Sequence, residues 1–153
     1  MLKQASIRQI QKSELTREQG YLVATMAFYP RGLKKELLDE YRAELAPDRE
    51  LFKEFKEQQA KVGHEAAFEK SRYEERFHLG RRATETLKNL ARMSQTQDVY
   101  LACQCEIGER CHREILLLIA EKEFGAKVDP LFHTYPVFEK RLKEALGESL
   151  KSR

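Results

Sequence analysis

The sequence predicts a small three-layer α/β protein, in which a mostly parallel sheet is flanked by helices and helical residues predominate. Two apolar runs, YLVATMAF at 21–28 and VYLAC at 99–103, have the composition of strands that are buried on both faces. The segments between them carry apolar residues at helical spacing. Strands separated by helices form βαβ units, and such units build parallel sheets.

Composition agrees with this fold class. The 153 residues are enough for a single domain over residues 1–153, and 41% apolar residues allow a globular core. Charged residues make up 35% of the chain, and glutamate is much more frequent than aspartate, which favours helices. The net charge of +3 excludes the one-sided electrostatic field of a dedicated nucleic-acid-binding protein.

The sequence also bears on where the protein works. Its first residues lack the continuous apolar segment of a signal peptide, and its apolar runs are too short to span a bilayer. Three cysteines are an odd number and do not form the disulfide framework of a small secreted domain. We therefore expect a cytoplasmic protein with free thiols, without a membrane partner and without a cofactor.

The first half of the chain begins with strands and continues as helix. The segment 5–10 predicts one strand and 21–28 predicts the next, which ends at a Pro-Gly turn in 29–32. Apolar residues at helical spacing predict a helix over 33–45, and after a proline break a second helix continues to Gly63.

The second half alternates helices with short strands. The apolar run at 99–103 is typical of a central parallel strand, and the helix that follows it is apolar nearly all round, as expected when sheet and helices cover it. Helices are predicted over 64–78, after Gly80, over 111–124 with Gly125 as the stop, and over 137–150; a short strand is predicted at 127–128.

Cations follow the predicted second strand, at the start of the predicted helix. Helix N-termini present free N–H groups and a partial positive charge. Arg31 and Lys34, next to the turn made by Gly32, would therefore complete an anion-binding site. A solvated turn without specific binding is the alternative interpretation of so short a motif.

The loop after the central strand carries more specific chemistry. A thiol at a helix N-terminus, beside guanidinium and imidazole groups, is placed where the nucleophilic thiolate is favoured. Cys111, His112 and Arg113 are the candidate catalytic residues, with Cys111 as nucleophile and His112 as proton carrier. Cys105 and Arg110 are candidate ligand-binding residues of the same loop.

Several alternatives remain open for these thiols. Cys103 ends a buried strand and is expected to be a core residue. Cys103, Cys105, Cys111 and His112 would also permit zinc binding, but adjacent Cys and His rarely bind one tetrahedral ion and no Cys-x2-Cys pair is present, so we expect no metal. A reversible disulfide between Cys105 and Cys111 is a further alternative. The other histidines are expected to be ordinary surface or core side chains: His64, His78 and His133.

Two motifs carry a family resemblance. A strand, Cys103, seven residues and then Cys111-His112-Arg113 opening an apolar helix resemble the signature of the domain-of-unknown-function 488 family. Independently, FYPRGLKKELLDEYRAELAPDRELFKEF at 28–55 resembles one branch of that family. The resemblance covers most of 6–128 and implies a small cytoplasmic α/β protein without a specified reaction. It transfers these positions: Pro30, Arg31, Gly32, Lys34, Cys103, Cys111, His112 and Arg113.

The chain departs from the family pattern near the end of the second strand. Members usually carry an Asp-Arg pair there, whereas this chain has Met26 and Ala27, and Tyr29 replaces the common Trp. If the acid and guanidinium assist a reaction in the family, that reaction is lost or altered here.

The function expected from these residues is that of a cysteine-dependent enzyme. Its substrate would be a small anionic, nucleotide-like molecule at the carboxyl ends of the strands. One alternative is a nucleotide-binding or nucleic-acid-binding protein without catalysis, although no interleaving of aromatic and basic residues favours nucleic acid. A rhodanese-like sulfurtransferase is another, because the segment from Cys105 to Arg110 resembles a Cys-x-x-Gly-x-Arg loop.

Overall fold

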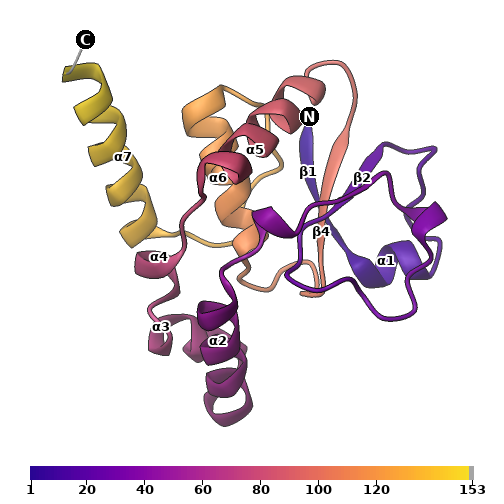
Figure 1. Cartoon of the computed structure of the whole chain (residues 1–153), viewed down its shortest axis with the longest axis horizontal. Coiled ribbons are helices and arrows are strands. Elements are labelled where there is room, and N and C mark those ends of the chain that lie inside the picture. Colours follow the sequence, from indigo (N-terminus) through magenta and orange to yellow (C-terminus); the bar gives the residue numbers. More distant parts are fainter. Residues whose placement is uncertain (152–153) are drawn as a thin grey trace.

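Four parallel strands form one sheet in the order β1-β4-β2-β3. Three of them, β1, β4 and β2, are labelled in Figure 1. The computed structural model describes the backbone of residues 1–151 and the side chains of residues 1–147. The strands are β1 (Leu2–Ser6), β2 (Tyr21–Ala24), β3 (Glu40–Tyr41) and β4 (Val99–Cys103). β4 lies between β1 and β2 and pairs with both in parallel. The α/β class and the central position of 99–103 are thus confirmed.

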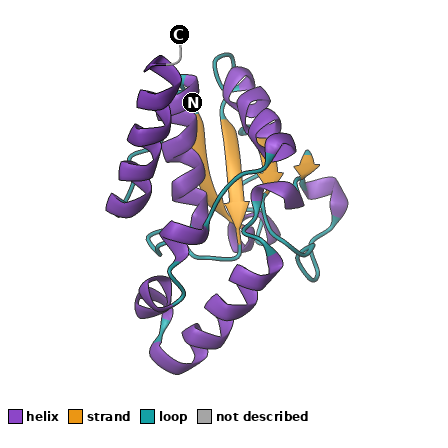
Figure 2. Cartoon of the chain, turned by 60° about the vertical axis from the view of Figure 1, so that its left-hand side comes forward, coloured by secondary structure: helices purple, strands orange, loops and turns teal. Residues whose placement is uncertain are grey.

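Helices cover both faces of this sheet (Figure 2). One face packs against α5 and α6, with α7 outside α6, and the other carries α1 and the chain between β2 and β3. No helix in the described part of the chain combines the length and the apolar character that crossing a membrane requires. The helices are α1 (Ile7–Gln11), α2 (Arg49–Val62), α3 (His64–Lys70), α4 (Tyr73–Arg76), α5 (Arg81–Met93), α6 (His112–Phe124) and α7 (Pro136–Lys151).

The core consists of two apolar clusters, one on each face of the sheet. Val23 and Leu101 belong to the cluster beneath α5 and α6, while Leu22 and Ala102 belong to the cluster beneath α1. Successive side chains of a strand point to opposite faces, so β2 and β4 are buried on both sides. This is the burial that their continuous apolar composition predicts.

The first strand is shorter and earlier than predicted. Residues 2–6 form β1, whereas 7–11, which lie largely within the predicted strand at 5–10, form α1. The reason is a capping box: the Ser6 hydroxyl accepts a hydrogen bond from the Gln9 N–H, and the Gln9 side chain accepts one from the Ser6 N–H. This reciprocal pair ends the strand and begins a helix within one residue.

The helix predicted over 33–45 is wrong. The chain there forms two short 3-10 turns, η1 (Lys35–Leu37) and η2 (Ala43–Leu45), on either side of the edge strand β3. Asp39 exchanges two hydrogen bonds with Leu22 of β2, one through its backbone N–H and one through its carboxylate. This pairing draws the segment to the edge of the sheet, and tertiary contacts override its helical spacing.

Candidate functional site

The carboxyl ends of β2 and β4 and the amino end of α6 meet at a cavity of about 650 Å³. Beyond the arrowheads of these strands lie α2 and α3 (Figure 2). Side chains of both helices line the cavity. Four residues of the predicted loop chemistry line this cavity: Cys103, Cys105, Cys111 and His112. In an open parallel sheet, ligands usually bind beyond the carboxyl ends of the strands.

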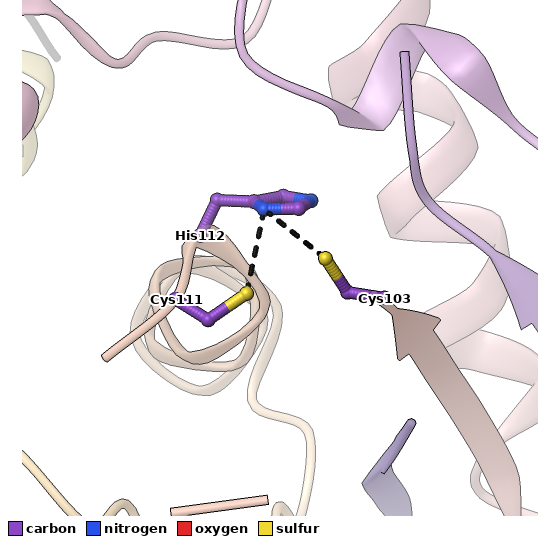
Figure 3. Close-up of side chains that lie close together, drawn as sticks. All are labelled: Cys103, Cys111 and His112. Atoms are coloured by element: carbon purple, nitrogen blue, oxygen red, sulfur yellow. Dashed lines mark hydrogen bonds between the residues drawn. The ribbon is translucent and has the colours of Figure 1, made fainter. Parts of the chain in front are cut away.

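Two of the thiols face the same imidazole nitrogen (Figure 3). The Nδ1 atom of His112 lies 3.6 Å from the Cys111 sulfur and 4.0 Å from the Cys103 sulfur. Cys103 is the last residue of β4, and Cys111 is the N-cap of α6. All three side chains are buried, and all their ligand atoms lie within 4.8 Å of one another. They form the Cys-Cys-His cluster.

The fold sets the orientation of the His112 ring. Its Nε2 atom lies 2.8 Å from the backbone carbonyl oxygen of Thr25, the residue directly after β2. Because a carbonyl oxygen only accepts, Nε2 carries the hydrogen and donates it. Nδ1 is thereby turned to the two sulfurs, where it serves as a base or as a ligand atom.

Mutual interactions shift the pKa values of two residues of the Cys-Cys-His cluster, Cys103 and His112, and that of the neighbouring Cys105. Hydrogen bonds from Cys105 and Cys111, together with the nearby imidazole, hold the pKa of Cys103 well below its ordinary value despite burial. Burial opposes the charge of His112, but the charges of the Cys111 and Cys103 sulfurs outweigh it and raise the pKa of the imidazole. Hydrogen bonding to Cys103 and Cys111, together with burial, raises the pKa of Cys105. The cluster therefore favours a thiolate beside an imidazolium.

Arg113, predicted as catalytic, is fully buried behind the loop and does not line the cavity. Its guanidinium donates to the carbonyl oxygen of Ala5 at 2.6 Å, and to those of Cys105 at 3.0 Å and Glu106 at 3.2 Å. A fourth bond reaches the side-chain oxygen of Gln4 at 2.9 Å. Arg113 thus joins the cysteine loop to β1, and it holds the loop in place from outside the cavity lining.

Arg110, predicted to bind a ligand, is also engaged elsewhere. It donates to the Glu65 carboxylate at 2.9 Å and to the Thr134 carbonyl oxygen, and its guanidinium lies 5.0 Å from the Tyr135 ring centre. Its own carbonyl oxygen accepts a hydrogen bond from His64 Nε2 at 2.6 Å. Arg110 therefore ties the loop to α3 and to the segment before α7.

Tyr135 and Glu114 form a hydrogen-bond network that reaches the backbone of Cys111. The Tyr135 hydroxyl donates to the buried Glu114 carboxylate at 2.7 Å and accepts from the Cys111 N–H at 3.3 Å. Glu114 also accepts from the Phe132 N–H at 2.6 Å and from His133 Nδ1 at 2.9 Å. The N-cap position of α6 is thus held by a side-chain network that secures the segment leading to α7.

The turn at 29–32 and the residues after it place one of their three predicted binding residues at the cavity. Arg31 lines the cavity, whereas Gly32 and Lys34 do not. Gly32 provides the turn, with a φ of 75° that favours glycine. Because the chain after Lys34 forms only a three-residue 3-10 turn, no α-helix N-terminus stands behind these cations, and the helix-dipole argument for an anion site fails here.

The cavity walls contain residues that the sequence analysis did not select. The aromatic side chains of Phe52, Phe55, Phe68 and Tyr73 line it, together with the cation of Lys56. His64, expected to be an ordinary side chain, also lines it. Their spacing along the helices is also what core packing would give. Only the position of α2 beyond the carboxyl ends of the strands shows that these side chains line a cavity. Cys103 was predicted as core, and it is buried and yet at the site.

The positions that depart from the family pattern also lie at the cavity. Met26 and Ala27, which occupy the positions of the usual Asp-Arg pair, line the cavity, as does Tyr29 in the position of the usual Trp. The substituted positions therefore lie where a ligand would be contacted.

The chain matches the family model described as DUF488-N3a, active DUF488-N3 subclade, over residues 5–123. No curated protein and no solved structure matches it. The matched region includes β2, β3 and β4, the end of β1, the whole Cys-Cys-His cluster and most of α6. The chain therefore belongs to the DUF488 family, in its active N3a subclade.

Proposed function

We propose that this protein is a cysteine-dependent enzyme that acts on a small anionic, nucleotide-like substrate at the carboxyl ends of the strands. The observation that carries the proposal is the pair of thiols, Cys103 and Cys111, that faces His112 Nδ1 at the cavity. An imidazole at this distance takes the proton of a thiol and stabilises the thiolate, which is the nucleophile. Membership in a subclade described as active supports catalysis.

Cys103 is the better placed of the two thiols for attack. It ends β4 at the cavity and keeps 6% of its surface accessible, whereas Cys111 keeps 1%. The proposal therefore assigns the attacking sulfur to Cys103 and the proton transfer to His112. Cys111, the nucleophile predicted from sequence, becomes the second thiol beside the same nitrogen.

The cavity walls support an anionic substrate with a flat ring. Arg31 and Lys56 bring positive charge to the cavity, against the single carboxylate of Glu109 among its lining residues. Aromatic side chains such as Phe52 and Phe68 offer flat apolar surfaces. A volume of about 650 Å³ lies within the usual range for sites that bind small molecules.

Thiol reactivity tests this proposal. Iodoacetamide at pH 7, followed by mass-spectrometric mapping, is expected to label Cys103 about 10 to 100 times faster than a free cysteine, because a thiolate reacts and a thiol does not. Cys103→Ser and His112→Gln are expected to abolish the fast reaction. Cys105→Ser is expected to keep it, because the serine hydroxyl still donates a hydrogen bond to Cys103. Fast labelling confined to Cys111 would return the nucleophile to the position predicted from sequence. Ordinary reactivity at both thiols would reject the enzyme.

The charge of the probe tests the proposed preference for anions. Iodoacetate is anionic and iodoacetamide is neutral, so the ratio of their rates at one thiol reports the local potential. Arg31→Gln or Lys56→Gln is expected to lower that ratio about two- to fivefold, as loss of one nearby cation in a partly solvated site implies. Lys34→Gln removes an exposed cation that does not line the cavity, and it should leave the ratio unchanged. Equal effects of all three changes would contradict a specific role of the cavity cations.

A further inference from the structure

We propose that the Cys-Cys-His cluster is also a binding site for a soft divalent cation, with Zn²⁺ as the ion that fits it, and that bound Zn²⁺ silences the thiols. The binding site rests on the positions and chemistry of the three ligand side chains. The silencing rests on the proposed function, because it requires that the same thiols react when no metal is bound.

The distances in the cluster are close to those of a tetrahedral site. Zn–S bonds of about 2.3 Å and Zn–N bonds of about 2.0 Å place a sulfur about 3.5 Å from a nitrogen, and two sulfurs about 3.8 Å apart. His112 Nδ1 lies 3.6 Å from the Cys111 sulfur and 4.0 Å from the Cys103 sulfur. No pair of ligand atoms exceeds 4.8 Å. Shifts of about an ångström would therefore complete three coordination bonds.

The imidazole is already oriented as a metal ligand. A histidine that binds a metal through one nitrogen almost always donates its other N–H to a carbonyl or carboxylate. His112 does this through Nε2, which bonds to the Thr25 carbonyl oxygen at 2.8 Å. The lone pair of a neutral imidazole is then directed from Nδ1 to the two sulfurs.

Cys111 and His112 are adjacent in the chain, and adjacent Cys and His residues rarely bind one ion. The backbone conformation here allows both side chains to do so. Cys111 is extended, with φ −153° and ψ 151°, and His112 begins α6. This change of direction at the N-cap lets both side chains turn to the same point. The third ligand, Cys103, arrives from the end of β4.

Charge balance favours a dication at this buried place. Two thiolates and one neutral imidazole carry a charge of −2, which Zn²⁺ cancels, so the occupied site is neutral inside the protein. Thiolates also select soft metals over Mg²⁺ or Ca²⁺. The three ligand residues line the cavity, which has room for a fourth ligand. Each thiolate donates one lone pair to the bound ion, which draws electron density from the sulfur, so Cys103 and Cys111 attack an electrophile more slowly when Zn²⁺ is bound.

Co²⁺ titration of the reduced, metal-free protein tests the site directly. Tetrahedral coordination by thiolates is expected to give intense visible ligand-field bands and a near-ultraviolet sulfur-to-cobalt charge-transfer band, and one equivalent of Zn²⁺ should bleach both. Native mass spectrometry should show one Zn²⁺ per chain. A pale octahedral spectrum without charge transfer, or no bound zinc, would overturn the proposal.

Variants identify the ligands. Cys103→Ser, Cys111→Ser and His112→Gln are each expected to weaken Zn²⁺ binding by more than roughly 100-fold, since loss of an outer-shell partner alone costs 10- to 100-fold. Cys105→Ser is the matched control, because Cys105 lines the same cavity but is not part of the cluster. It should keep the full charge-transfer intensity. Loss of intensity in Cys105→Ser would overturn the three-residue assignment, and far-ultraviolet circular dichroism checks that each variant is folded.

Alkylation separates the two proposals. In wild type, one equivalent of Zn²⁺ is expected to suppress iodoacetamide labelling of Cys103 and Cys111 at least tenfold, and a chelator should restore it. Fast thiols without a cobalt charge-transfer band would refute the metal site and leave the enzyme proposal standing. A cobalt band with slow thiols in the metal-free protein would refute the enzyme proposal and its silencing while retaining the metal site. Fast labelling that persists at saturating Zn²⁺ would refute the silencing.

Discussion

Replacement of Arg113 by alanine is expected to lower the free energy of unfolding by about 4 kcal/mol, because each buried acceptor left without its donor costs about 1 to 3 kcal/mol. Four acceptors lose their donor at once: Gln4 Oε1 and the carbonyl oxygens of Ala5, Cys105 and Glu106. The truncation also leaves a cavity beside β1. Urea unfolding followed by circular dichroism measures the change.

Two further variants make this result interpretable. Arg113→Lys keeps the charge but not the planar set of donors, so it should lose about 2 kcal/mol and remain folded. Arg8→Ala is the control, because Arg8 lies on the surface near the same loop and pairs with Glu106 at 3.8 Å. An exposed pair of this kind contributes at most about 1 kcal/mol. A change at Arg113 no larger than that at Arg8 would contradict the anchoring role.

Replacement of Glu114 by alanine is expected to destabilise the protein by about 3 kcal/mol. Its fully buried carboxylate accepts from the Phe132 N–H, from His133 Nδ1 and from the Tyr135 hydroxyl. Hydrogen bonds to a charged group contribute about 1.5 to 3 kcal/mol each, and donors left unpaired in the interior add a desolvation penalty. Urea unfolding at neutral pH tests the value.

The same helix supplies the control for Glu114. Glu121 is exposed, and among the side chains that the structure describes it pairs only with its neighbour Lys122 at 3.5 Å, so Glu121→Ala should change stability by less than about 0.5 kcal/mol. Tyr135→Phe removes one of the three donors to Glu114 and the partner of the Cys111 N–H, and about 1 to 2 kcal/mol is expected. If Glu114→Ala is as stable as Glu121→Ala, the carboxylate does not hold the segment before α7.

Much of the fold was predictable because its signals are local. The run 99–103 has the uninterrupted apolar composition of a strand buried on both faces, and it lies at the centre of the sheet. The helix after it ends at Gly125, whose φ of 67° suits glycine. The predicted helix over 33–45 failed because its apolar spacing was compatible with helix, while the pairing of Asp39 with Leu22 is not visible in the local pattern.

The candidate site was likewise predictable in part from the sequence. The loop from Cys103 to Arg113 was identified from residue types that favour thiolate chemistry beside a helix start. The roles inside the loop were not readable, because they depend on the direction in which each side chain points. Arg113 turns away from the cavity, whereas Cys103, expected to be inert, meets His112.

The sequence by itself thus determined the α/β class, the central strand and the place where the chemistry is concentrated, since periodicity, composition and motif order are properties of neighbouring residues. The tertiary structure alone decided which groups meet. Thr25 and His112 are 87 positions apart in the chain, yet the bond between them orients the ring that both thiols face. Such contacts form only when strands and helices pack, because hydrogen bonds and close packing depend on distances in space and not on distances along the chain.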